Sequence, residues 1–387
     1  MGKSKKIAIL ITPTTEYTRE IIRGIFKYSG NKSEWETSRI PTYLDRLKML
    51  AEYKLDGIIT FSGEKTTLDI IAELQIPIIN TSSYSSELVV PRVITDNAEI
   101  GRKAAEYFIG LGFRQGAFFG NLWTAFAQTR GEGFCAELAR HGISCSVYSE
   151  SKEEAGIVGL ASHKITEEEK TYAWLRDLPK PVGILAWADS GARHLANICL
   201  QRHLHIPDEV ALLGVDDDIM ECTITDPPLS SVTLGGENIG YEAAHMLDLL
   251  MSGKELPSRE VRLPPMGITV RTSTDTLAVS DPDVASALRY IRAHASEPIG
   301  VADVLDAVPL SRRVLEIRFR TRLGSSILEE ITRAHVELAK QLLADVEMPN
   351  AMVAQRAGFR SINALYVAFR RMVGMSPNAF RNFYHRQ

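Results

Sequence analysis

The sequence predicts a two-part protein, with an α/β body of parallel sheets followed by an all-α domain that contains two helix-turn-helix motifs. Up to about residue 274, short apolar runs alternate with amphipathic stretches, whereas the pattern after Asp283 is wholly helical. The charge also divides unevenly. Residues 282–387 carry 15 Lys+Arg and 10 Asp+Glu, while residues 1–281 carry 29 and 38. An acidic body joined to an Arg-rich domain suggests that the C-terminal part contacts nucleic acid.

The composition is that of an ordinary globular protein: 387 residues, 45% hydrophobic and 24% charged. It argues against disordered and fibrous classes, and the length suits two or three domains. The sequence has no apolar run near the roughly 18 residues of a membrane span and no signal-peptide pattern, so we expect a cytoplasmic protein. The four cysteines show no metal-type spacing, so we expect buried reduced thiols and neither a metal nor another cofactor. They are Cys135, Cys145, Cys199 and Cys222.

The first strand–loop–helix unit lies at the start of the chain. Lys6–Ile11 is a short apolar run that predicts a buried strand, and Thr12–Thr15 predicts the loop after it. An amphipathic helix should follow. Its apolar side chains are Ile21, Ile22, Ile25 and Phe26. This order of elements is the unit from which parallel sheets are built.

The same unit repeats along the chain. Residues 66–74 predict a helix, and Asp96 begins a clearer one because Asp96 and Glu99 have capping-box spacing. The apolar face of that helix is Ile100, Ala104, Phe108 and Leu111. Further buried strands are predicted at 57–61, 76–80, 116–120, 182–185 and 210–214. The alternation predicts parallel sheets with helices on both faces.

Polar and aromatic residues lie where these strands end, and loops at the carboxyl ends of parallel strands form ligand sites. Carboxylate and Arg pairs can span the hydroxyls of a polyhydroxyl ligand, with an aromatic ring against its C–H groups. The candidates are Thr14, Asp96, Asn121, Trp123, Arg130, Trp187, Asp189 and Asp216. Each has a structural alternative. Asp96 could be only a helix cap, Arg130 a surface cation, the two Trp residues core, and Asp216 part of a solvated turn.

Several segments of the α/β part resemble the effector domain of the LacI/GalR repressor family. They are Arg130-Gly-Glu-Gly-Phe134, Gly214-Val-Asp216-Asp217, Ser230-Ser-Val232 with Ile239-Gly240, Asp96-x4-Gly101 and Arg271-Thr-Ser-Thr274. The resemblance implies a two-lobed, periplasmic-binding-protein-like (type I) sensor over residues 1–274. Its lobes would be roughly 5–110 plus 232–255, and 112–230 plus 258–273. It also implies effector contacts for Asp96, Arg130 and Asp216. Asp189 falls beside the family's usual Asn-Asp pair, where this sequence departs with Ala188.

After a linker at 275–283, the sequence predicts the first helix-turn-helix unit. Helices are expected at 284–295 and 301–308, and Ser311 is a good N-cap for the next one. In that helix Leu315, Phe319 and Leu323 repeat at i, i+4 and i+8 and should be buried. The polar residues Arg312, Arg313, Glu316 and Arg320 lie off this stripe.

A second unit repeats the pattern. A short helix is expected at 350–357, and Ser361, 50 residues after Ser311, caps the next one. The expected buried stripe is Ile362, Leu365, Phe369 and Met372, while Asn363, Tyr366 and Arg370 face away. Between the units, about 19 residues of helix (325–343) would span ~28 Å at about 1.5 Å per residue. Since that is near the ~34 Å between major grooves on one face of DNA, both second helices could enter successive grooves.

The segment Ala354-Gln-Arg-Ala-Gly-Phe359…Phe369-Arg-Arg-Met-Val-Gly374-Met-Ser376-Pro377 closely resembles the signature of the AraC family. The resemblance implies a bipartite DNA-binding domain over 284–387. Arg312, Arg313, Glu316 and Arg320 align with its first reading helix, and Ser361, Asn363 and Tyr366 with its second. Arg370 is a further candidate. For each Arg the alternative is a phosphate contact or a role in solubility.

The two halves together resemble regulators of bacterial xylose operons. Agreement occurs in both parts, for example at Ser33-Glu-Trp35 and Leu229-Ser-Ser-Val232 and at Tyr290-Ile-Arg-x-His294. The resemblance implies a sugar effector of the xylose-like pentose type, operator DNA as partner, a homodimer, and a possible contact with RNA polymerase. The alternatives are the same architecture sensing a different sugar, and a sugar-processing α/β enzyme. The sequence lacks four common catalytic or cofactor-binding motifs, the GxSxG elbow, the P-loop, the dinucleotide fingerprint and HExxH. We therefore expect that the protein is not an enzyme.

Overall fold

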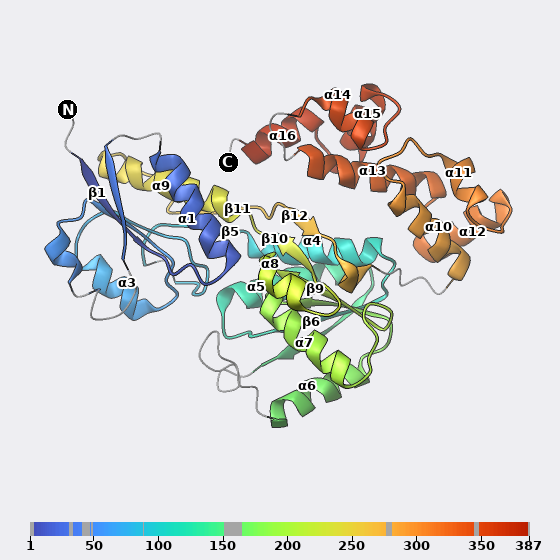
Figure 1. Cartoon of the computed structure of the whole chain (residues 1–387), viewed down its shortest axis with the longest axis horizontal. Coiled ribbons are helices and arrows are strands. Elements are labelled where there is room, and N and C mark those ends of the chain that lie inside the picture. Colours follow the sequence, from blue (N-terminus) through green and yellow to red (C-terminus); the bar gives the residue numbers. More distant parts are fainter. Residues whose placement is uncertain are drawn as a thin grey trace. The chain divides into compact units, whose positions relative to one another are not determined.

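A computed structural model describes residues 4–30, 34–40, 47, 49–87, 89–150, 165–275, 281–343 and 348–385 (Figure 1). The chain divides into two compact units, Met1–Phe108 with Gln115–Asp275, and Ile109–Arg114 with Thr276–Gln387. The first unit contains two α/β lobes and the second is helical, which confirms the predicted fold class. Within the described ranges, no helix is both long and apolar enough to cross a bilayer.

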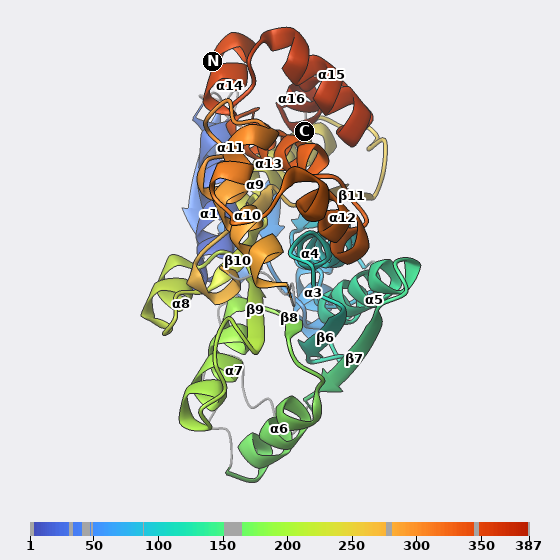
Figure 2. The same cartoon turned by 90° about the vertical axis from the view of Figure 1, so that its right-hand side faces the viewer.

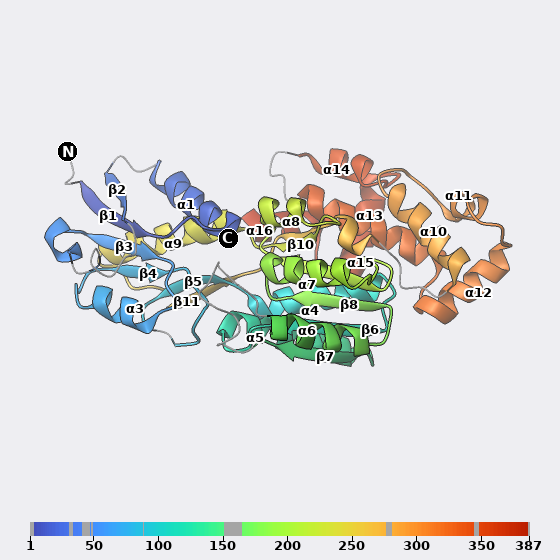
Figure 3. The same ribbon diagram turned by 60° about the horizontal axis from the view of Figure 1, so that its bottom comes forward.

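The first lobe is built on a six-stranded sheet whose described pairings are all parallel, in the order β11-β5-β4-β3-β1-β2. Its strands are β1 (Lys5–Leu10), β2 (Trp35–Arg39), β3 (Gly57–Thr60), β4 (Ile78–Asn80), β5 (Arg92–Thr95) and β11 (Glu260–Leu263). Figure 3 shows α1 (Glu16–Ser29) and α9 (Gly236–Met251) on one face and α3 (Lys65–Ala72) on the other. Alternate strand residues therefore enter two cores, Ile7 and Ile9 beneath α1 and α9, and Ala8 and Leu10 beneath α3.

The second lobe has the strand order β12-β10-β9-β8-β6-β7, and among its described pairings only that of β10 with β12 is antiparallel. Its strands are β6 (Gln115–Gly120), β7 (Ser144–Ser149), β8 (Val182–Ala186), β9 (Val210–Val215), β10 (Ser230–Thr233) and β12 (Gly267–Thr269). The helices that follow these strands or lead into them are α4 (Asn97–Gly110), α5 (Ala125–Arg140), α6 (Ile165–Asp177), α7 (Asp189–Gln201) and α8 (Ile219–Ile224). Buried Phe119 and Ile184 anchor the core beneath α6 and α7.

The structure differs from the sequence predictions at several points in this unit. β11 pairs with β5 in the first sheet, although residues 258–273 were expected in the second lobe, and β10 extends the second sheet to Thr233. The chain therefore crosses between lobes after Thr233 and after Leu263. Phe26, expected on the buried face of α1, is 46% exposed because the core beneath that helix is closed by Ile21 and Ile25.

The four cysteines do not behave alike. Cys199 and Cys222 are buried and unpaired, as expected. Cys135 and Cys145 instead form a disulfide, because the end of α5 turns back onto β7 and brings their Cα atoms to 5.4 Å. The expectation of four reduced thiols is therefore wrong for this pair.

The second unit is helical after residue 281 (Figure 2). Its helices are α10 (Pro282–Ala293), α11 (Val301–Asp306), α12 (Arg312–Leu323), α13 (Ile327–Leu343), α14 (Asn350–Arg356), α15 (Ile362–Val373) and α16 (Pro377–His385). α13 belongs to both halves of this unit, since it packs against α10 and α12 and also against α14, α15 and α16. Leu315 and Phe319 of α12 are buried, and so are Leu365 and Phe369 of α15, as predicted. Ile362 was expected in the buried stripe but is 42% exposed, because it occupies the first position of α15, beyond the helices that cover the stripe.

Two glycines set the distance between α1 and α9. A Cβ at Gly24 would lie 1.9 Å from the Glu237 carbonyl oxygen, and one at Gly240 would lie 1.9 Å from the Ile21 carbonyl oxygen. The two helices therefore approach with backbone against backbone, which only glycine permits at both positions. This contact holds the N-terminus of α1, and the loop before it, at the edge of the sheet where a ligand site is expected.

Gly240→Ala should destabilise the α/β unit by about 1–3 kcal/mol, because the added methyl group must push the two helices apart. Gly110→Ala is the matched control, since a Cβ there meets nothing within 4 Å. Urea unfolding monitored by circular dichroism measures both. If Gly240→Ala unfolded at the same urea concentration as Gly110→Ala, the close approach of α1 and α9 would not be a constraint.

Candidate functional site

The candidate ligand residues come from loops at the carboxyl edge of both sheets. Thr14 follows β1, Asn121 and Trp123 follow β6, Trp187 and Asp189 follow β8, and Asp216 follows β9. Because β6, β8 and β9 are neighbours in the second sheet, their loops open at one edge. The expected convergence of these loops is therefore present in the structure.

Arg130 lies on α5 rather than in a loop, is 4% exposed, and reaches this edge with its side chain. Its Nε donates to Asn97 Oδ1 at 2.9 Å, its Nη1 donates to the Trp187 carbonyl oxygen, and its Cζ lies 4.9 Å from the centre of the Phe126 ring. Burial lowers the pKa of the guanidinium, and the charge of Asp216 opposes that shift. The alternative of a surface cation is thus excluded for Arg130.

The side chain reaches Asn97 because α4 and α5 pack closely. A Cβ at Gly101 would lie 2.1 Å from the Arg130 carbonyl oxygen, and one at Gly133 would lie 2.4 Å from the Ala98 carbonyl oxygen. Glycines in the Asp96-x4-Gly101 and Arg130-Gly-Glu-Gly-Phe134 segments therefore position the guanidinium. Asn97 itself, which sequence reasoning did not single out, also donates through Nδ2 to Ser83 Oγ and the Thr95 carbonyl oxygen.

Asp216, directly after β9, has an unusual backbone conformation. Its φ is 110° and that of Asp217 is 52°, a left-handed conformation that residues with a Cβ seldom adopt. Burial raises the pKa of the Asp216 carboxyl to about 6, while Arg130 opposes the rise and Asp218 adds to it. Among the described residues no hydrogen-bond donor contacts this carboxylate, so its oxygens are free to accept hydrogen bonds from a ligand.

Asp189 is 1% exposed and both of its oxygens contact the protein. Ser231 Oγ donates to Oδ1 at 2.5 Å, and the Asp218 backbone N–H donates to Oδ2 at 2.8 Å. Burial, together with the neighbouring Asp216 charge, raises the pKa of Asp189 well above its ordinary value. These two hydrogen bonds fix the position of the loop between β9 and α8 relative to Asp189. A direct contact between Asp189 and a ligand stays a prediction.

Two indoles of the site retain unused donors. Trp123 Nε1 and Trp187 Nε1 are buried and have no hydrogen-bond partner among the described residues. The Trp123 ring lies 5.8 Å from that of Tyr84, which comes from the first lobe, and the Trp187 ring lies 5.9 Å from that of Phe126. Since a buried N–H without a partner is unfavourable, these groups are suited to donate to ligand oxygens.

The other candidates make local bonds. Asp96 Oδ1 accepts from the Glu99 backbone N–H, which is the helix-cap role named as its alternative. Asn121 Oδ1 accepts from Thr124 Oγ1, and Thr14 is exposed. For these three residues ligand contact remains a prediction.

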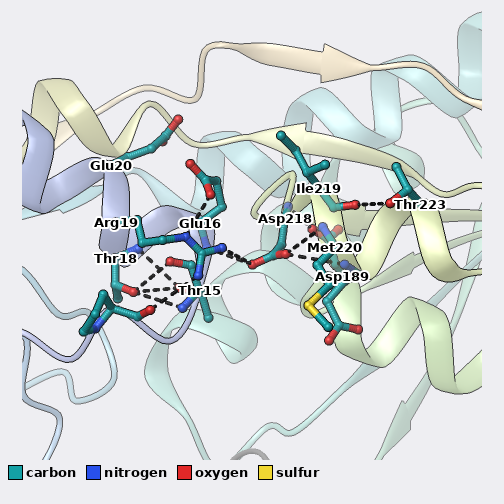
Figure 4. Close-up of polar contacts among 12 residues, drawn as sticks. Thr15, Glu16, Thr18, Arg19, Glu20, Asp189, Asp218, Ile219, Met220 and Thr223 are labelled. Atoms are coloured by element: carbon teal, nitrogen blue, oxygen red, sulfur yellow. Dashed lines mark hydrogen bonds and ion pairs between the residues drawn. The ribbon is translucent and has the colours of Figure 1, made fainter.

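Asp218, which sequence reasoning did not single out, joins the two lobes (Figure 4). Its Oδ1 caps α8 by accepting from the Met220 and Glu221 backbone N–H groups. Its Oδ2 accepts from the Glu16 backbone N–H at 2.8 Å and lies 3.3 Å from Arg19 Nη2, both at the start of α1. One carboxylate thus caps a helix in each lobe.

The candidate DNA-binding residues lie mostly on exposed faces. Arg312, Arg313 and Arg320 are exposed on α12, with Glu316 half-buried, and Asn363 and Arg370 are exposed on α15. Ser361 Oγ accepts from the Ala364 backbone N–H, so it caps α15, and the Tyr366 hydroxyl accepts from Asn350 Nδ2 of α14. Ser311 occupies the N-cap position of α12 but its side chain makes no capping bond.

Comparison with known proteins agrees with this architecture in each part. Residues 6–98 match the XylR N-terminal domain family, residues 105–274 the periplasmic binding protein-like domain family, and residues 304–382 a helix-turn-helix domain family. The first match lies in the first lobe, the second spans the second lobe together with α9 and β11 of the first, and the third covers most of the helical unit.

The similarity also extends over whole proteins. The chain is 28% identical over 388 residues to the xylose operon regulatory protein of Escherichia coli K12, covering 98% of this chain and 97% of that protein. The protein of the same name from Haemophilus influenzae is 28% identical over 97% of this chain and 98% of its own length. A solved structure of the xylose-binding transcription activator XylR gives a TM-score of 0.63 at 27% identity, covering 98% of both chains.

Arg19→Ala should increase the separation of the lobes in the sugar-free protein, because it removes one of the two contacts that Asp218 makes with α1. An ion pair of this exposure contributes up to about 1 kcal/mol, so the open fraction should rise about two- to fivefold. Spin labels at exposed Glu73 and Gln201 report the distance between lobes.

Arg23→Ala is the matched control, since the ion pairs of Arg23 with described residues are those with Glu16 and Glu20 of its own helix. It should leave the distance distribution unchanged. Identical distributions for Arg19→Ala and the unaltered protein would show that Asp218 does not hold the lobes together.

Proposed function

We propose that this chain, which is a XylR-like transcription regulator with a periplasmic-binding-protein-like sensor followed by an AraC-type helix-turn-helix domain, responds to a pentose of the xylose type. It is a regulator and not an enzyme. The sensor binds a sugar effector and the helical unit binds DNA. The choice of xylose is supported by the names of the relatives that the chain matches over nearly its whole length.

The arrangement around Arg130 and Asp216 is the observation that supports a neutral polyhydroxyl ligand. A carboxylate with free oxygens lies near a buried guanidinium, and two indole N–H groups without partners lie in the neighbouring loops. Such a set offers acceptors and donors for adjacent hydroxyls, while the rings of Trp123, Trp187 and Phe126 can pack against C–H groups. We assign Asp216 and Arg130 to the hydroxyl contacts, and Asp189 to holding Asp218 and the β9–α8 loop.

In the helical unit we assign DNA contact to Arg312, Arg313 and Arg320 of α12 and to Asn363 and Arg370 of α15. Their exposure supports this role, and so does the match to helix-turn-helix domains. Ser361 and Tyr366 position the second reading helix instead. Homodimerisation and contact with RNA polymerase complete the proposal, the latter supported by the similarity to a transcription activator.

Isothermal titration of the full chain with D-xylose tests the sensor. Asp216→Asn should weaken binding at least tenfold at pH 7.5, because an amide offers one acceptor where the carboxylate offers two and loses its charge. Unchanged affinity would overturn the assigned role of Asp216. Binding of several pentoses and hexoses with equal strength would overturn the choice of a xylose-type sugar.

The same titration at pH 5 gives an independent check. With a pKa of about 6, the Asp216 carboxylate is mostly charged at pH 7.5 and mostly protonated at pH 5, so sugar affinity should fall about tenfold with acidification. Asp216→Asn should bind weakly at both pH values. An unaltered protein with equal affinity at pH 5 and pH 7.5 would contradict the role of this group.

A further inference from the structure

Four large apolar side chains are exposed on the helices to which DNA contact is assigned; Val314 and Ile362 are 38% and 42% exposed, and the other two are the most exposed and occupy equivalent positions. Ile317 on α12 is 55% exposed and Val367 on α15 is 69% exposed. Exposure of a single apolar residue is ordinary on a protein surface. Here the same feature occurs twice, at equivalent positions of two helices that match in several other respects.

The two helices share length, ends and register. Each has 12 residues, begins after a Ser and ends at a Gly with positive φ, 75° for Gly324 and 81° for Gly374. Every equivalent position is separated by 50 residues, from Ser311 and Ser361 to Gly324 and Gly374. Ile317 and Val367 are therefore the same position of a repeated reading helix.

That position lies opposite the buried stripe of each helix. Leu315 and Phe319 face inward on α12, so the residues at i, i+4 and i+7 on the far side are Arg313, Ile317 and Arg320. On α15, inward-facing Leu365 and Phe369 leave Asn363, Val367 and Arg370 on the far side. Each helix thus presents one branched apolar side chain between exposed hydrogen-bond donors.

The charged residues beside Ile317 and Val367 indicate which kind of partner these helix faces bind. An apolar protein surface would leave Arg313, Arg320 and Arg370 without a counter-charge, whereas DNA supplies phosphates and acceptor atoms on both sides. In the major groove the 5-methyl group of thymine is the apolar group that distinguishes base pairs, and a small aliphatic side chain can read it.

We propose that Ile317 and Val367 are specificity-determining residues, each of which contacts the 5-methyl group of a thymine in the major groove while the flanking donors bind phosphates or base edges. The inference rests on the proposed DNA-binding function of α12 and α15. α13 joins the two halves of the unit with 17 residues of helix, about 25 Å at 1.5 Å per residue. The two thymines should consequently lie about one helical turn, 10–11 base pairs, apart.

Replacement of thymine by uracil tests this directly, because it removes the methyl group and leaves every hydrogen-bonding atom. Duplexes are first selected from a random-sequence DNA library with the full chain, with and without D-xylose. Each dT of a selected duplex is then changed singly to dU. Two positions about one turn apart should each lose about fourfold in affinity, the effect of withdrawing one buried methylene-sized group.

The variants assign each position to a residue. Ile317→Ala should no longer distinguish dT from dU at one position, and Val367→Ala at the other, while both still fold, since alanine is favourable in an exposed helix. Leu328→Ala is the control, because Leu328 is 57% exposed on α13 and belongs to neither reading helix. It should retain both sensitivities.

Three outcomes would count against the proposal. Binding that is insensitive to every dT→dU change would overturn it while leaving DNA binding intact. Unchanged sensitivity in both Ala variants would show that other residues read the methyl groups. A chain that enriched no duplex under either condition would overturn the proposed function as well.

Discussion

A guanidinium held away from water at the carboxyl edge of the second sheet needs a partner for each of its donors, and Arg130 determines much of what surrounds it. Asn97 and the Trp187 carbonyl oxygen accept two of its N–H groups, and the Asp216 carboxylate lies near enough to offset its charge. Removing one partner of such a buried arrangement costs about 3–5 kcal/mol. Gly101 and Gly133 let α4 and α5 pack closely enough for the guanidinium to reach Asn97, so the packing of these helices and the hydrogen bonds of Arg130 depend on each other.

The fold was accessible from the sequence wherever periodicity was strong. Buried strands such as β8 and β9 are continuous apolar runs. α15 has apolar residues at helical spacing, begins after the N-cap Ser361 and ends at Gly374. Strands with mixed composition were not recognised. β2 contains Glu, Thr, Ser and Arg, and β7 contains three Ser residues. Each strand lies at one edge of its sheet, where hydrophobicity is not required on both faces.

The site was only partly accessible for a different reason. Residue type and strand ends pointed to Arg130 and Asp216, and the family resemblance added to this. The different roles of Asp189, Asp216 and Asp218 depend on backbone torsions and on contacts between the lobes. A local sequence pattern does not predict either of these. Asp216 has a positive φ and is the proposed acceptor for ligand hydroxyls, Asp189 accepts hydrogen bonds from Ser231 and from the Asp218 backbone, and Asp218 caps one helix in each lobe.

The contacts that Asp218 makes between the lobes suggest how sugar binding could change the conformation of the protein. A ligand shifts a conformational equilibrium only through its different affinity for the two states, and we expect those states to differ in the contacts that Asp218 makes between the lobes. In the proposed function the helical unit responds to this change through α12 and α15, two helices of matched length and register.

The most direct test of sugar-dependent DNA recognition is fluorescence anisotropy of a selected duplex, titrated with the full chain in the absence and presence of saturating D-xylose. The account predicts that the sugar changes the affinity for that duplex at least about fivefold, and that Asp216→Asn binds the duplex but shows no change. Affinities that are identical with and without D-xylose and every other pentose and hexose would contradict it.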